Sequence, residues 1–211
     1  MANSTSIVII DYGSGNLRSV AKAFEKVAIN SKIAVSADAR LLETASHIVL
    51  PGVGAFADCM AGLTALSGMI EALNEQVIMR GKPFLGVCVG MQMLFERGHE
   101  HGIHKGLGWL SGEVVPLADI TNALKIPHIG WNELNIQKKS PLLSGINNGD
   151  HAYFVHSYHA VPTDASQLLA TVEYGKPIAA MVGRDNIFGT QFHPEKSQKT
   201  GLRILENFVR L

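Results

Sequence analysis

The sequence predicts an α/β fold with a mostly parallel central sheet, flanking helices and an antiparallel extension. In the first half of the 211-residue chain, short β-branched runs alternate with stretches of helical periodicity. This is the pattern of a parallel sheet whose faces are covered by helices. After residue 108, strand-like runs follow one another with only turns between them, which favours antiparallel pairing. No linker or repeat interrupts the chain, so we expect residues 1–211 to form a single domain.

The first half supplies strands and helices in alternation. It begins with the strand SIVII (6–10), the turn DYGSGN (11–16) and the helix LRSVAKAFEKVA (17–28), in which Leu17, Val20 and Phe24 recur at helical spacing. The elements expected next are the strands KIAVS (32–36) and HIVL (47–50), the helical pattern GLTALSGMIEALNEQVIMR (62–80), and the buried strand KPFLGV (82–87) leading into the helical MQMLFER (91–97).

The second half is expected to be β-rich and to end in a helix. Its strand-like runs have β-branched and aromatic residues between turn-forming ones. They are EVVPL (113–117), NELNI (132–136), AYFVHSYHAV (152–161), LLATVEYG (168–175), IAAMVG (178–183) and NIFGTQFH (186–193). Only KTGLRILENFVRL (199–211) returns to helical spacing.

Charge and cysteine content exclude several classes of partner and compartment. The 18 basic residues balance the 18 acidic ones, so no net positive field attracts nucleic acid or an anionic membrane. The apolar stretch 50–70 contains prolines, glycines and an aspartate, and we interpret it as a loop and a buried helix. Two cysteines form no disulfide framework, and MANSTSIVII lacks the features of a secretory signal. We expect a cytoplasmic protein.

Two motifs that suggest a cofactor or a metal are better explained without one. GSGNLR begins like a dinucleotide fingerprint, but Arg18 stands where the third glycine is needed. HEHGIH brings His99, His101 and His104 together in a hydrophilic, glycine-containing segment without zinc-like spacing to a cysteine or carboxylate cluster. We interpret this segment as a solvated loop and expect no cofactor and no metal.

Cys88 lies in GVCVG, directly after an expected strand. A Gly-x-Cys-x-Gly segment at a strand-to-helix junction has the form of a nucleophile elbow, in which small neighbours permit a sharp turn. The following helix would direct its positive end at the thiol, and the Val89 N–H would face a developing oxyanion. The alternative is an inert buried thiol.

A thiol nucleophile needs a base and a group that orients the base. In QFHPEKS, His193 and Glu195 lie two residues apart, so they share a face of an extended backbone. His193 is the candidate base and Glu195 the group that holds its imidazole; the alternative is a surface turn. The segment Gly52-Val53-Gly54, just beyond another strand, supplies N–H groups that can complete an oxyanion hole.

Taken together, PGVG, GVCVGMQ and QFHPEKS resemble, in order and separation, the class I glutamine amidotransferases, whose triad is Cys, His and Glu. The resemblance covers nearly the whole chain. DYGSGNLRSV, PHIGWNEL and YFVHSYH make it similar, within that family, to the glutaminase subunits of imidazole glycerol phosphate synthase. The resemblance implies hydrolysis of L-glutamine to glutamate through a Cys88 thioester, and delivery of ammonia for histidine biosynthesis.

The same resemblance implies roles for further residues. The partner would be a (β/α)8 cyclase subunit, which forms a heterodimer with this chain and receives ammonia through a protected tunnel. The implied substrate-binding residues are Gly52, Gln92, Glu100, Ser157 and Tyr158, with Glu100 facing the α-ammonium group. The candidates for the partner-facing surface are Arg18, Trp131, Tyr153 and Lys196.

Three alternatives stay open on the sequence alone. A γ-glutamyl hydrolase or cysteine peptidase on a related fold would share the elbow and the triad. A paralogous amidotransferase would use the same glutaminase chemistry in another pathway. A noncatalytic interaction subunit is disfavoured because Cys88, His193 and Glu195 are all present.

Overall fold

The computed structural model describes residues 5–119 and 124–211. The helices are α1 (Leu17–Val27), α2 (Leu41–Thr44), α3 (Phe56–Ala65), α4 (Met69–Leu73), α5 (Val89–Gln92) and α6 (Gln198–Val209), with a π-helical segment at Asn74–Met79 and 3-10 turns at Leu117–Asp119, Pro141–Leu143, Ala165–Gln167 and Pro194–Lys196. The strands of the first half are β1 (Ser6–Ile10), β2 (Lys32–Ser36), β3 (His47–Gly52), β4 (Phe84–Cys88), β5 (Arg97–Gly98) and β6 (His104–Lys105). Those of the second half are β7 (Gly112–Pro116), β8 (His128–Glu133), β9 (Asn135–Ile136), β10 (His151–His156), β11 (Tyr158–Pro162), β12 (Leu168–Glu173), β13 (Pro177–Arg184) and β14 (Ile187–Thr190).

The main sheet of the described chain has the strand order β2-β1-β3-β4-β14-β13-β12-β9. From β2 to β14 neighbouring strands are parallel, and from β14 to β9 they are antiparallel. All residues of β3 and β4 are buried, as expected for parallel strands covered on both faces. The predicted α/β class with an antiparallel extension is confirmed, and the extension continues the parallel sheet at one edge.

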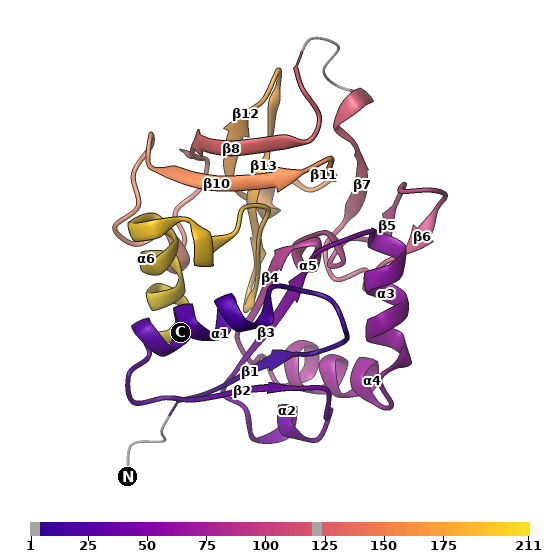
Figure 1. Ribbon diagram of the computed structural model, residues 1–211, viewed down its shortest axis with the longest axis vertical. Helices are drawn as coiled ribbons and strands as arrows, with labels where there is room; N and C mark the ends of the chain where they lie inside the picture. Colours follow the sequence, from indigo (N-terminus) through magenta and orange to yellow (C-terminus); the bar gives the residue numbers. More distant parts are fainter. Residues whose placement is uncertain (1–4, 120–123) are drawn as a thin grey trace.

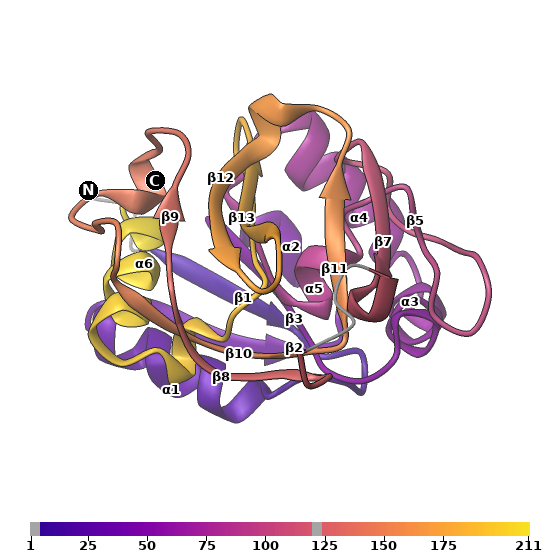
Figure 2. The ribbon, with the colours of Figure 1, turned by 90° about the horizontal axis from the view of Figure 1, so that it is seen from above.

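Helices cover both faces of this sheet, and smaller sheets lie at one end of it. In Figures 1 and 2, α1 and α6 lie together on one side of the sheet, and α3 and α4 lie on the other. Phe24 of α1 and Phe208 of α6 are fully buried, and their ring centroids are 6.1 Å apart. The strands β8 and β10 pair antiparallel, and β11, β7, β5 and β6 form another small sheet. Both small sheets lie near the carboxyl end of β4 (Figure 1).

The helix expected over 62–80 is wrong as a single element. The structure begins α3 at Phe56, ends it at Ala65, and starts α4 at Met69, with the α3 and α4–π-helical segments bent by 95°. Gly68 adopts a left-handed conformation with φ of 70°, which only glycine adopts readily. The chain turns there, and both Leu63 and Leu73 enter the core.

Three further expectations about elements need correction. The helix expected over 91–97 is replaced by α5, which ends at Gln92, and Arg97 already belongs to β5. NELNI is divided between β8 and β9 by Leu134, whose side chain is fully buried. AYFVHSYHAV is divided at Ser157, where the chain leaves β10 and enters β11 of a different sheet.

In the described chain no single helix has the length and apolar character needed to cross a bilayer; the bent pair Phe56–Ala65 and Met69–Met79 meets both criteria jointly. The interpretation of the N-terminal stretch concerns residues 1–4 in part, and these lie outside the described residues.

Candidate active site

Cys88 ends β4 and adopts φ of 56° and ψ of −112°, a conformation that L-residues adopt only under constraint from their surroundings. Two glycines create that constraint. A Cβ on Gly86 would lie 2.4 Å from the Gly90 carbonyl oxygen, and one on Gly90 would lie 1.8 Å from the Leu50 carbonyl oxygen. The strand-to-helix turn can therefore form only with glycine on both sides of the cysteine, as the elbow motif predicts.

The electrostatic part of the elbow argument needs correction. The sequence predicts a helix after Cys88 that directs a positive dipole end at the thiol, but α5 spans only Val89–Gln92. So short a helix aligns few peptide dipoles. Stabilisation of a thiolate at Cys88 must come mainly from side chains that reach it from elsewhere in the fold.

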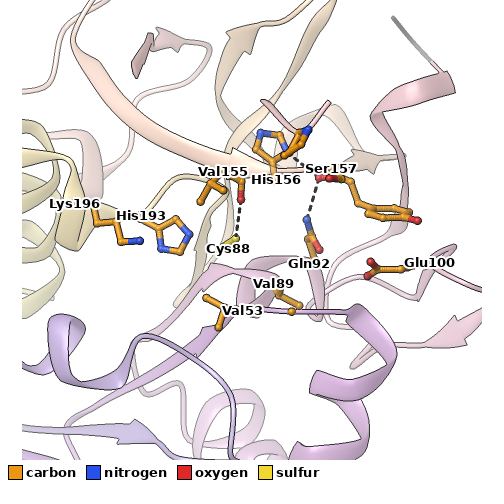
Figure 3. A pocket seen from close by; sticks show the side chains of 13 residues that line it. Val53, Cys88, Val89, Gln92, Glu100, Val155, His156, Ser157, His193 and Lys196 are labelled. Carbon is orange, nitrogen blue, oxygen red and sulfur yellow. Dashed lines mark hydrogen bonds between the residues drawn. The ribbon is translucent and has the colours of Figure 1, made fainter. Parts of the chain in front are cut away.

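His193 and Glu195 form a buried pair beside Cys88. His193 follows β14, and Pro194 starts the 3-10 turn that contains Glu195. His193 Nδ1 lies 2.9 Å from Glu195 Oε1, and the two side chains are 3% and 0% exposed. His193 Nε2 has no hydrogen-bond partner within the described part of the chain, and the ring lies beside Cys88 (Figure 3). Nε2 is thus the ring atom that can exchange a proton at the reaction centre.

The charge of this pair follows from its surroundings. Burial lowers the pKa of His193, but the Cys88 and Glu195 side chains beside it raise it by more, to about 9. At neutral pH the imidazole therefore carries a proton and can pair with a thiolate. A protonated Nε2 is also the general acid that a departing amine requires.

A pocket of about 320 Å³ opens in front of Cys88. It is lined by most of the residues that the sequence predicts for the site, together with three that it does not. The predicted ones are Val53, Gly54, Cys88, Val89, Gln92, Glu100, Ser157, Tyr158, His193 and Lys196; the additional ones are Pro127, Val155 and His156. Gly52 and Glu195 do not line the pocket. Gly52 is paired with Cys88 across the neighbouring strands β3 and β4, and Glu195 contacts the side of His193 that bears Nδ1.

The segment after β3 is held against the loop that follows β1. The Tyr12 hydroxyl donates to the Pro51 carbonyl at 2.7 Å. The Val53 carbonyl accepts from the Ser14 hydroxyl and from Cys59 Sγ, the latter at 3.5 Å. Because a trans peptide places its C=O and N–H on opposite sides, the Gly54 N–H faces away from Ser14. This arrangement fixes two of the peptide groups in the predicted oxyanion segment.

The predicted substrate residues offer specific hydrogen-bonding groups. Gln92 Nε2 donates both its hydrogens, to the Tyr158 carbonyl and to Gln191 Oε1, each at 3.1 Å. Its Oε1 is then the atom left to accept a hydrogen bond from a ligand. Glu100 Oε2 accepts from the Phe56 N–H at the start of α3 at 2.7 Å, so a carboxylate is held at the pocket wall.

Three of the four predicted interface residues form a cluster, which reaches the pocket through Lys196. The rings of Trp131 and Tyr153 meet edge to face with centroids 5.9 Å apart, and Lys196 Nζ lies 5.9 Å from the Tyr153 centroid. Trp131 is 46% exposed. Arg18 lies on α1 and is exposed. We call Trp131, Tyr153 and Lys196 the rim cluster.

Sequence reasoning missed several residues of the site. Asn16 Nδ2 donates to Glu195 Oε1 at 3.3 Å, and Gln191 contacts Cys88. The only signal for Asn16 is its place at the end of DYGSGN, and nothing in the sequence marks Gln191. His128 and His156 form a further buried pair, 2.9 Å apart between Nδ1 and Nε2.

The His128–His156 pair is uncharged. Burial lowers the pKa of His128 to about 4, and that of His156 to about 3. His156 Nδ1 lies 2.8 Å from the Tyr158 carbonyl, to which only an N–H can donate, so His156 Nε2 accepts from His128 Nδ1. This chain of hydrogen bonds fixes the turn at Ser157, where the chain passes from β10 to β11 along the pocket.

Within the described residues, no group of three or more His, Cys, Asp or Glu side chains is placed to hold a metal ion. In the segment interpreted as a solvated loop, His104 lies on β6 and His99 Nε2 contacts Glu113 Oε2 at 2.8 Å.

The fold and the site define an α/β enzyme in which a strained cysteine at the end of a central parallel strand is paired with a buried histidine and glutamate. Residues 8–211 match the family Glutamine amidotransferase class-I. The chain belongs to the class I glutamine amidotransferase family, and it is an enzyme that acts on the side-chain amide of glutamine.

Relatives of known name lie within this family. The imidazole glycerol phosphate synthase subunit HisH of Rhodospirillum rubrum is 54% identical over 209 residues, which cover 97% of this chain and 98% of the relative. The protein of the same name from Mesorhizobium japonicum is 52% identical over 211 residues, with the same coverage.

Solved structures of lower identity share the fold. A chain in the structure of PurLQS from Thermotoga maritima has a TM-score of 0.73 at 18% identity, and the match covers 98% of both chains. A glutamine amidotransferase from Thermotoga maritima has a TM-score of 0.63 at 19% identity, and the match covers 90% of this chain and 76% of that one.

Proposed function

We propose that this chain is the glutaminase subunit of imidazole glycerol phosphate synthase, with Cys88, His193 and Glu195 as its catalytic residues. The single observation that carries the assignment of the pathway is identity above 50% over nearly the full length of relatives that bear this name. The single observation that carries the assignment of the residues is the juxtaposition of Cys88 with the buried His193–Glu195 pair.

The first half of the reaction forms a thioester. The Cys88 thiolate attacks the carbonyl carbon of the glutamine side-chain amide, and the carbonyl oxygen becomes an oxyanion. N–H groups of the Gly52-Val53-Gly54 segment and of Val89 stabilise that charge. His193 gives its Nε2 proton to the nitrogen, the C–N bond breaks, and ammonia leaves. The products of this step are ammonia and a γ-glutamyl thioester on Cys88.

The second half hydrolyses the thioester. His193, now neutral, takes a proton from a water molecule whose oxygen attacks the thioester carbon. The C–S bond breaks, and glutamate and the Cys88 thiolate are released. Glu195 accepts the Nδ1–H of His193 in both halves, so it keeps Nε2 directed at the reaction centre and stabilises the imidazolium. One glutamine and one water give one glutamate, one ammonia and one proton, which the new carboxyl group releases to the solvent.

The ammonia is consumed by a partner, for which we propose a (β/α)8 cyclase subunit bound at the rim cluster in a heterodimer. Lys196 belongs both to the pocket lining and to the rim cluster. A partner bound there would cover the mouth of the pocket and keep ammonia from water. Two free thiols, Cys59 and Cys88, support a reducing cytoplasm as the compartment.

A nucleophile variant tests this function in the reconstituted complex. We predict that Cys88→Ala abolishes glutamine-dependent synthesis, because no atom remains to form the thioester. Synthesis from added ammonium salt should persist at nearly the wild-type rate, because the cyclase site is untouched. Both rates are measured in the same assay of the cyclase product. Loss of the ammonia-dependent rate as well would assign Cys88 a structural role.

The alternative functions make different predictions, which assays with other substrates and other partners separate. A γ-glutamyl hydrolase or cysteine peptidase would turn over γ-glutamyl peptides faster than free glutamine. A paralogous amidotransferase would hydrolyse glutamine but fail to support synthesis with the imidazole glycerol phosphate cyclase. A noncatalytic subunit would show no glutaminase activity with any partner.

A further inference from the structure

Gln191 directly follows β14 and lies beside Cys88, on the side opposite the oxyanion segment. The parallel register pairs Thr190 of β14 with Val87 of β4, so the next residue along, Gln191, is level with Cys88. On the other side, β3 places Gly52 level with Cys88. The Gln191 residue is 0% exposed, so its amide is out of reach of bulk water.

Both ends of the Gln191 amide are engaged at the site. Nε2 lies 3.8 Å from Cys88 Sγ, and Oε1 lies 3.1 Å from Gln92 Nε2. The orientation of the amide follows from its neighbours. Gln92 faces the Tyr158 carbonyl at 3.1 Å, and a carbonyl can only accept, so the Gln92 atom there is Nε2. The same Nε2 donates to Gln191, which must present Oε1 to it and therefore turns Nε2 toward Cys88.

A fixed N–H donor next to a sulfur distinguishes between its two charge states. A neutral thiol is a weak acceptor, whereas a thiolate accepts a charge-assisted hydrogen bond that gains strength in a buried, water-free position. The four-residue α5 supplies little dipole stabilisation at this point. A side-chain donor thus contributes what the short helix does not.

We infer that Gln191 is a positioning residue for the glutaminase reaction, which stabilises the Cys88 thiolate through Nε2 and orients the substrate residue Gln92 through Oε1. The inference rests on the proposed function, because it requires Cys88 to be the nucleophile. Hydrogen-bond donors then lie on both sides of Cys88. The oxyanion segment Gly52-Val53-Gly54 lies at the end of β3, and the donor to the thiolate, Gln191, follows β14.

The test uses two substitutions that separate the contact of Gln191 with Cys88 from its contact with Gln92. Gln191→Glu keeps an oxygen for Gln92 but replaces the donor facing Cys88 with an acceptor. Gln191→Met removes both contacts at similar length. Gln167→Met is the matched control, because Gln167 is also a buried glutamine, and its side-chain hydrogen bonds within the described residues go to Ser111.

The primary measurement is the rate at which iodoacetamide alkylates Cys88 as a function of pH, followed by mass spectrometry of the Cys88 peptide. The full-length chain is used, and Cys59 serves as an internal reference because burial raises the pKa of its thiol. The titratable groups that interact electrostatically with Cys88, which all the variants retain, are His193, Tyr12 and Cys59.

In both Gln191 variants we expect Cys88 alkylation at neutral pH to slow by about tenfold, the effect of losing one hydrogen bond to a charged group. The curve of Cys88 alkylation rate against pH should move to higher pH, and at high pH the rate should reach the same maximum as in the wild type. kcat for glutamine should fall in both, and KM should rise only in Gln191→Met, where Gln92 loses its acceptor. Gln167→Met should keep the wild-type alkylation profile even where its melting temperature falls as far as that of Gln191→Met.

Failure of the Gln191 inference and failure of the proposed function give different results. If Gln191→Glu and Gln191→Met alkylate at Cys88 with the wild-type profile, the inference is wrong even if kcat falls, because the role of Gln191 is then only structural. If the wild-type Cys88 reacts no faster than Cys59, or if Cys88→Ala retains glutaminase activity, the proposed function itself fails.

Discussion

The histidine of this site is tuned by its two neighbours more than by its burial. A buried imidazole without a negatively charged partner loses its proton, as His156 does, with a pKa lowered by burial to about 3. His193 is also buried, but it lies between Cys88 and the Glu195 carboxylate, and its pKa rises to about 9. The difference between these two buried rings comes from the charges that face them.

The first residue-scale prediction concerns Glu195→Gln. Loss of the carboxylate removes one of the causes that raise the His193 pKa. The alkaline limb of the kcat/KM profile should move to lower pH, and kcat should fall on the order of a hundredfold. The profile is measured for the complex with its partner. Glu206→Gln on α6 is the control and should leave the profile unchanged, because the ion pairs of Glu206 among the described residues are with exposed arginines.

The same shift has a consequence for stability with a definite sign. A histidine whose folded pKa is raised from 6.5 to about 9 stabilises the fold fully below pH 6.5, and that contribution is lost as the pH rises through about 9. Glu195→Gln should therefore reduce the difference in the free energy of unfolding between these two pH values. An unchanged difference in denaturant titrations would contradict the assigned pair.

The sequence predicts the three residues proposed to react, but not the residues that contact them. Cys88, His193 and Glu195 are each marked by a local pattern of glycine, proline or spacing. Gln191 and Asn16 carry no such mark, because their roles depend on partners 103 and 179 residues away in the chain. Only the pairing of β14 with β4, and the packing of the loop after β1 near the 3-10 turn, bring those atoms together.

At the scale of elements, the elbow depends on close packing of β3, β4 and α5. The predicted order of strands and helices is largely right, because period-2 and helical patterns survive in short segments. The predicted lengths of two helices are wrong. An apolar pattern continues through Gly68 and beyond Gln92, but φ of 70° at Gly68 and the early start of β5 end the helices there. Tertiary packing, which a local pattern does not contain, decides those ends.

The element-scale prediction is that Gly90→Ala destroys the elbow. A Cβ at Gly90 would lie 1.8 Å from the Leu50 carbonyl oxygen, so β3 and α5 would have to separate. We expect a loss of about 4 kcal/mol or more in the free energy of unfolding, and no glutaminase activity. Chemical denaturation measures the first, and glutamate release the second.

The control for this prediction is Gly108→Ala. Gly108 has φ of 67°, and an added Cβ would meet no atom within 4 Å. The free energy of unfolding should fall by about 1 kcal/mol, because alanine adopts a left-handed backbone less readily than glycine does. Glutaminase activity should be retained. Equal losses in the two variants would mean that the contact at Gly90 is relieved easily and that the elbow is not tightly packed.

At the scale of the whole molecule, the site lies where the main sheet meets the small sheets, next to the rim cluster. Lys196 lies in the 3-10 turn that also contains Glu195, and its Nζ lies over the Tyr153 ring. A partner that contacts the rim cluster would therefore contact the turn that also contains Glu195, a residue of the proposed catalytic site. This gives a direct physical route from partner binding to the reaction centre.

We predict that the isolated chain binds glutamine but hydrolyses it very slowly. The Gly52–Val53 peptide has a glycine at one end, so its N–H can reorient at small cost, whereas the Pro51 and Val53 carbonyls are held by Tyr12 and Ser14. One missing oxyanion donor costs roughly 3 kcal/mol, or on the order of a hundredfold in rate. The cyclase and its ligand should raise kcat by that order and change KM much less.

Steady-state glutaminase rates of the chain alone, with partner, and with partner plus ligand measure this coupling. Tyr12→Phe removes the donor to the Pro51 carbonyl. It should raise the basal glutaminase rate of the isolated chain, because the loosened Gly52-Val53-Gly54 segment then directs its N–H groups at the oxyanion more often. Full activity in the unpartnered wild-type chain would rule out the coupling.

The short α5 gives Cys88 one further property. In the roles proposed above, the groups that stabilise its thiolate are His193 and Gln191, which lie more than 100 residues further along the chain, and not the turn that follows it. A chain in which β1, β3 and β4 have assembled, but β14 has not yet docked, would lack both of these groups beside Cys88. On these proposed roles, Cys88 becomes a reactive thiol only when β14, the last central strand to be synthesised, has docked. Alkylation of Cys88 during refolding would therefore time the docking of β14, and newly made protein would acquire its reactive thiol only once its C-terminal region had emerged from the ribosome.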